Sequence, residues 1–69
     1  MTIRVSTHNV TQFQYPIVRH FLASETRKSE FWVLELTCQD AQGNVITAEY
    51  YTTSPDIFRG FECEYVEVK

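Results

Sequence analysis

The sequence predicts a mainly β protein, built as a small five-stranded antiparallel barrel or strongly bent sheet in an SH3-like or OB-like strand order. Residues 30–38 and 44–53 are two β-prone runs joined by a polar segment that contains Gly43, which is typical of a β-hairpin. The chain has five Phe, four Tyr and one Trp among 69 residues, and such large side chains fill a small core efficiently. We expect residues 1–69 to form one domain.

Alternating polar and apolar residues predict further strands at the two ends of the chain. Thr2–Ser6 alternates in this way, and residues 7–9 then have the polar composition of a turn. Residues 61–68 predict the last strand, with Phe61, Cys63 and Tyr65 on one face.

Residues 13–23 fit two structures. As a strand, they offer aromatic and β-branched side chains, and Pro16 then requires an edge position or a bulge. As a helix, they place Ile17, Val18, Phe21 and Leu22 on one stripe. The helix would give an α+β alternative, β-α-β-β-β, with one helix on a four-stranded antiparallel sheet. The composition favours the strand.

Helix signals occur between the fourth and fifth predicted strands. Ser54 suits an N-cap, Pro55 the first helical position, and Gly60 the position after the last turn. They enclose so few residues that we expect a single turn of 3-10 or α-helix before the last strand.

The net charge of −3 is divided unevenly along the chain. Residues 1–29 carry four basic and one acidic side chain, a balance of +3, and residues 30–69 carry two basic and eight acidic ones, a balance of −6. A nucleic-acid-binding protein usually has a basic footprint, so the acidic half argues against that class.

The residues with metal-binding or catalytic chemistry are few. His8, His20, Cys38 and Cys63 lack the close spacing of zinc ligands, and no phosphate-binding glycine loop or nucleophile elbow occurs. We therefore expect no enzyme activity, no catalytic residue, no metal and no cofactor.

The location predicted from the sequence is cytoplasmic. No apolar signal segment follows Met1, and no apolar run approaches the roughly 20 residues of a membrane span, so no membrane partner is expected. Cys38 and Cys63 are then expected as free, partly buried thiols, with a disulfide between neighbouring strands as the alternative.

Adjacent aromatic residues in the hairpin provide the main functional hypothesis. Phe31 and Trp32 must point to opposite faces of their strand, as must Tyr50 and Tyr51, so one member of each pair faces away from a one-sided core. We expect a non-catalytic protein-binding module or a small inhibitor or regulator, a kind of protein that phages also make, whose partner has a basic surface. The expected binding residues are Phe31, Trp32, Glu49, Tyr50, Tyr51, Glu62 and Glu64.

Two alternative functions use other features. A small barrel that binds single-stranded nucleic acid would use Arg19, Arg27, Lys28 and Trp32. A homo-oligomeric structural subunit would bury the outward aromatic side chains against copies of itself.

Overall fold

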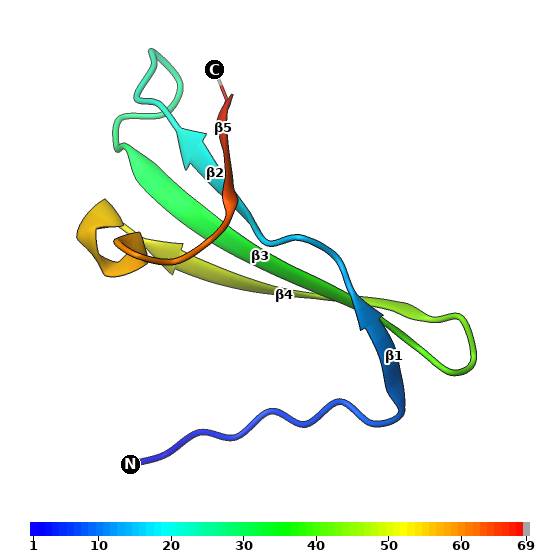
Figure 1. Cartoon of the computed structure of the whole chain (residues 1–69). Helices are drawn as coiled ribbons and strands as arrows, with labels where there is room; N and C mark the ends of the chain where they lie inside the picture. Colours follow the sequence, from blue (N-terminus) through cyan, green and yellow to red (C-terminus); the bar gives the residue numbers. More distant parts are fainter. Residues whose placement is uncertain (69) are drawn as a thin grey trace.

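A computed structural model describes residues 1–68 and confirms the mainly β fold class. The sheet is curled into a half-barrel (Figure 1). One 3-10 turn precedes the last strand, as predicted. The elements are β1 (Val10–Phe13), β2 (Ile17–Phe21), β3 (Phe31–Asp40), β4 (Val45–Thr52), the 3-10 turn η1 (Pro55–Phe58) and β5 (Glu64–Val68).

The ten-residue strand β3 organises the sheet. On one side it pairs with β4 along the predicted hairpin, in continuous antiparallel register from Trp32↔Thr52 to Gln39↔Val45. On the other side it pairs first with β2 and then, farther along, with β1. β5 adds to the outer side of β2 in parallel, so the sheet is mixed and runs β4–β3–β2–β5.

The ambiguous segment 13–23 forms a strand rather than a helix. β1 and β2 follow one another along β3, and the gap between them contains Pro16. Proline has no backbone N–H to give to a ladder, and within sheets it is confined to edges and interruptions of this kind. The Pro16 carbonyl still accepts a 2.8 Å hydrogen bond from the Glu64 N–H, at the start of β5.

The predicted strand at residues 2–6 is wrong. Residues 1–9 form an extended arm without secondary structure, and the first strand is β1 instead (Figure 1). Alternation gives the arm two faces, but a strand also needs a neighbouring strand edge, and the arm meets none within residues 1–68. Asn9 lies at the junction with φ of 58°, a left-handed conformation that asparagine tolerates.

The two faces of the sheet are best named after neighbouring residues of β3. The Leu34 face also carries Val18, Trp32, Cys38 and Tyr50, and the Glu35 face carries Arg19, Phe31, Val33 and Tyr51. The chain must cross one face between β4 and β5, and the right-handed path of such crossovers places it over the Leu34 face. Near-complete burial of Val18 and of Phe58 in η1 agrees with this path.

The apolar core is small. Within residues 1–68, the buried apolar side chains are Val18, Val33, Cys38 and Phe58. The Cα radius of gyration is 14.2 Å, compared with about 11 Å for a compact domain of this length. No helix among the described residues has the length and hydropathy needed to cross a membrane. The half-barrel is therefore an open structure with much apolar surface in water.

Candidate protein-binding surface

The hairpin places its aromatic pairs as the sequence predicts, on alternate faces. Phe31 and Tyr51 lie on the Glu35 face, and Trp32 and Tyr50 on the Leu34 face. Exposure, however, is concentrated on β4. Tyr50 and Tyr51 are 52% and 66% exposed, whereas Phe31 and Trp32 are half-buried.

An aromatic stack runs across the Glu35 face from β2 to β4. Phe21 and Phe31 stack with ring centroids 4.8 Å apart, and Phe31 stacks on Tyr51 at 5.9 Å. The Arg27 guanidinium lies 5.0 Å from the centre of the Phe21 ring, and it also donates a hydrogen bond to the Leu22 carbonyl. Phe31 therefore contacts one side of the Tyr51 ring, while most of Tyr51 remains exposed.

Glutamates line the same face beside this stack. Glu49 on β4 lies directly opposite Glu35 on β3, and Glu35 forms an ion pair with Arg19. Glu64 lies farther along this row, next to Ile17, whereas Glu62 precedes β5. Glu49 makes no ion pair within residues 1–68, so it faces a like charge on β3 without a cation of its own.

Trp32 on the other face is already in contact with a neighbouring strand. Its ring stacks on His20 with centroids 4.5 Å apart, and His20 Nε2 lies 2.9 Å from a carboxylate oxygen of Glu30. Trp32 therefore helps to hold β2 against β3, and Tyr50 is the more open aromatic residue on this face.

One edge of β4 pairs with no strand in the part of the chain that the structure describes. On β3, the Thr37 carbonyl accepts from Gln14, toward β1, whereas the Asp40 N–H donates to Asn44, toward the hairpin turn. Backbone groups alternate between the two sides of an antiparallel strand, so the even-numbered residues of β4 point toward β3. The N–H and C=O groups of Thr47, Glu49 and Tyr51 therefore point away from the sheet, and within residues 1–68 no strand pairs with them. We call this row the β4 edge.

The turn before β4 is held by one carboxylate. Asp40 accepts hydrogen bonds from the Asn44 side chain and from the N–H groups of Asn44 and Gln42. The Asn44 side chain and then the Asn44 N–H hold the pKa of Asp40 below its ordinary value. The ionised Asp40 carboxylate therefore stabilises the turn that leads into β4.

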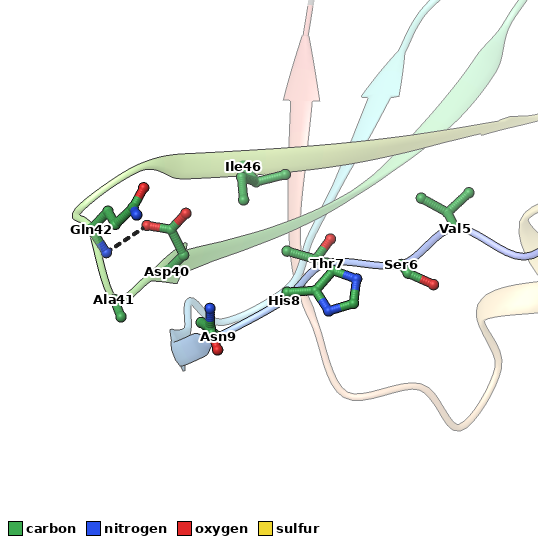
Figure 2. A pocket seen from close by; sticks show the side chains of 9 residues that line it. All are labelled: Val5, Ser6, Thr7, His8, Asn9, Asp40, Ala41, Gln42 and Ile46. Carbon is green, nitrogen blue, oxygen red and sulfur yellow. Dashed lines mark hydrogen bonds between the residues drawn. The ribbon is translucent and has the colours of Figure 1, made fainter.

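A hollow separates the arm from β4. It has a volume of about 510 Å³, and Figure 2 shows the arm residues Val5 to Asn9 on one side and Asp40 to Gln42 with Ile46 on the other. A neighbouring groove of about 280 Å³ lies between Val5 and the apolar residues Leu36, Ala48 and Tyr50. The arm thus lies beside the Leu34 face without filling the space above it.

The residues predicted for nucleic-acid binding are divided between surfaces. Arg19 is paired with Glu35 on one face, and Trp32 lies on the opposite face. Arg27 stacks on Phe21, and Lys28 is in the exposed segment that follows β2. The structure does not assemble these four side chains into one site.

The candidate metal-binding side chains are also dispersed. Within residues 1–68, no group of three or more His, Cys, Asp or Glu side chains is placed to hold a metal ion. Cys38 is a buried free thiol and Cys63 a half-buried one, so the prediction of unpaired cysteines is confirmed.

No family model, no curated protein and no solved structure matches this chain. The functional proposal therefore rests on the geometry of the molecule itself. That geometry adds Val5 to the candidate surface, because Val5 lines the groove with Leu36, Ala48 and Tyr50. Ile3 is exposed farther along the arm, and sequence reasoning assigned both residues to a strand of the sheet. Their alternation at residues 2–6 was the available signal, but the missing strand partner became visible only in the fold.

Proposed function

We propose that this protein is a non-catalytic binding module that takes up an extended segment of a protein partner along the β4 edge. The observation that carries the proposal is an eight-residue edge strand whose outward backbone groups pair with no strand within residues 1–68. Two of its tyrosines are more than half exposed. An exposed sheet edge is a template for strand addition, in which main-chain hydrogen bonds give affinity and side chains give specificity.

Specificity would come from the side chains on both sides of this edge. Tyr50 offers an aromatic surface on the Leu34 face, whereas Tyr51 and Glu49 lie together on the Glu35 face. Tyrosine is enriched among residues that dominate binding energy. A segment with a basic residue would also neutralise Glu49, which has only Glu35 opposite it on β3.

A comparison of two substitutions at one position tests the proposal. Glu49→Pro removes an outward-pointing N–H without removing a bond of the β3–β4 ladder, whereas Glu49→Ala keeps the N–H and removes only the charge. The wild-type chain and both variants would be immobilised, and the proteins that each retains from a lysate compared by mass spectrometry. We expect a stoichiometric partner that the alanine variant retains in part and the proline variant loses. Equal recovery by the proline variant would contradict use of the edge.

Single-stranded nucleic acid remains the second candidate, and it ranks lower because its four predicted residues do not converge. Binding would stack a base on an exposed ring and depend steeply on salt. A titration with a single-stranded oligonucleotide at low salt, followed by Trp32 fluorescence, separates the two proposals. No change in fluorescence is expected.

A further inference from the structure

We propose that the segment taken up by the β4 edge is the arm of a second copy of this chain, so that two copies exchange arms reciprocally. This inference rests on the proposed use of the β4 edge and names its occupant. It follows from the arm's pattern, from its charge and from the surface that a single copy leaves in water.

The arm has the pattern of a strand, but no strand pairs with it within residues 1–68. Ile3 and Val5 are 83% and 81% exposed, and both lie on the same side of an extended segment. Arg4 lies between them, on the other side, and makes no ion pair within residues 1–68. The arm therefore carries two apolar side chains and one cation that its own sheet leaves without partners.

One alignment of the arm along the β4 edge gives all three of these residues a partner. If Arg4 of one copy lies opposite Glu49 of the other, the added strand puts Arg4 on the Glu35 face, and Ile3 and Val5 fall on the Leu34 face. There they meet Ala48 and Tyr50, in either strand direction, because both residues flank Glu49. This register supplies the cation that Glu49 lacks. It also puts Ile3 and Val5 of the other copy beside Ala48 and Tyr50, where the chain's own Val5 lines an open groove.

The exposed area is sufficient for such a pair. The chain exposes 5688 Å², and a compact monomer of 8.1 kDa would expose about 4,500 Å². The excess of about 1,200 Å² exceeds the roughly 600–1,000 Å² that each partner buries in a standard interface. Two-fold exchange would use each arm and each β4 edge once, which closes the assembly as a dimer.

The path of the chain permits the exchange. At Asn9 the backbone adopts φ of 58°, and the Asn9 carbonyl accepts a 2.9 Å hydrogen bond from the Ala41 N–H. The junction between arm and sheet is thus anchored at the hairpin turn. The residues before it lie across a hollow from β4 rather than packed on it (Figure 2).

Sedimentation velocity of purified full-length chains tests the inference. We expect the wild-type chain to sediment with twice the monomer mass at tens of micromolar. Ile3→Ser with Val5→Ser should weaken dimerisation at least about tenfold, because each dimer loses four apolar contacts. The matched control Thr2→Ala with Ser6→Ala changes the other side of the arm and should leave the dimer intact.

Mixing two deficient variants identifies the contact. The Ile3→Ser/Val5→Ser variant has an impaired arm and an unchanged β4 edge, whereas Glu49→Pro has an impaired β4 edge and an unchanged arm. Each variant alone should therefore be a monomer. An equimolar mixture restores one of the two arm–edge contacts, and we expect heterodimers that form more weakly than the wild-type dimer. Arg4→Glu should also weaken the dimer, and Glu49→Arg in the same chain should restore it.

The outcomes separate this inference from the proposed function. A wild-type chain that stays monomeric up to about 1 mM, or variants that dimerise as the wild type does, would overturn arm exchange. The capture experiment could instead recover a different protein that only Glu49→Pro fails to retain. That result would support binding at the β4 edge and would show that the occupant is not the arm of a second copy. Variants should keep the wild-type circular dichroism spectrum, because every substituted side chain is exposed.

Discussion

β4 and β5, the strands at opposite edges of the β4–β3–β2–β5 order, differ in how they are protected. β5 has five residues, and Glu64 and Glu67 are two of them. β4 has eight residues, of which only Glu49 is charged, and it exposes Tyr50 and Tyr51. Short length and charge protect an edge from pairing with other chains, whereas a long, β-prone edge invites it. By these criteria β4 is the edge more open to pairing with another chain.

Removing Phe58 should have the largest effect, because this side chain lies in the connection that joins β4 to β5. Phe58 is almost fully buried, and Phe→Ala in a core costs about 3–5 kcal/mol. A domain of this size has a total stability of only about 3–10 kcal/mol. We expect Phe58→Ala to lose about 3–5 kcal/mol, a large part of this total, in urea titrations at 25 °C followed by Trp32 fluorescence. A loss below about 1 kcal/mol would show that the connection does not cover the core.

Exchanging the chemistry of the two edges should have the next largest effect. Tyr50→Lys with Tyr51→Lys places two charged side chains on β4, as Glu64 and Glu67 do on β5. These substitutions should weaken binding at the β4 edge at least about tenfold. Glu64→Thr with Glu67→Thr removes the protection of β5 and should create concentration-dependent association. Light scattering measures both changes. Unchanged behaviour in both variants would mean that edge charge does not decide which strand is covered.

Interrupting the aromatic stack should have a moderate effect and shows how β4 is supported. Phe31 contacts both Phe21 and Tyr51, and an aromatic pair contributes about 0.5–1.5 kcal/mol beyond its buried area. Phe31→Leu should therefore destabilise the chain by about 1–2 kcal/mol in urea unfolding. His20 and Trp32 stack on the opposite face, so the near-ultraviolet dichroism of Trp32 should be preserved in this variant.

Protonating Asp40 should have the smallest effect, because the group is exposed. Its pKa is lowered in the folded chain, so the ionised carboxylate stabilises the turn above the unfolded value of about 3.9. This contribution is lost as the pH falls through the folded pKa. We expect Asp40→Asn to be less stable than the wild type at pH 7, with the difference shrinking below pH 4. A constant difference across that range would contradict the role of the charge.

The hairpin and the one-turn helix could be predicted because their signals are local. The run from Phe31 to Asp40, the turn around Gly43 and the Ser54–Pro55 start each define structure within a few residues. The alternating faces of Tyr50 and Tyr51 follow from the same strand geometry.

The arm and the sheet order could not be predicted in the same way, because they depend on contacts between distant segments. Alternation at residues 2–6 is compatible with a strand, but it does not say whether an edge is available beside it. The parallel pairing of β5 with β2 begins where the Pro16 carbonyl accepts a hydrogen bond from the Glu64 N–H, a contact between residues far apart in the sequence. The seven residues predicted for binding include three from β4 and none from the arm, whose proposed role depends on such distant contacts.

Hydrogen exchange at the outward amides of β4 tests the central claim most directly. Exchange of the Thr47, Glu49 and Tyr51 N–H groups would be followed by NMR in dilute and in concentrated samples, with the amides of β5 as the internal comparison. Occupation of the β4 edge predicts fast exchange when dilute and at least tenfold slower exchange when concentrated or when a captured partner is added. Exchange at the rate of exposed amides under all of these conditions would contradict the account.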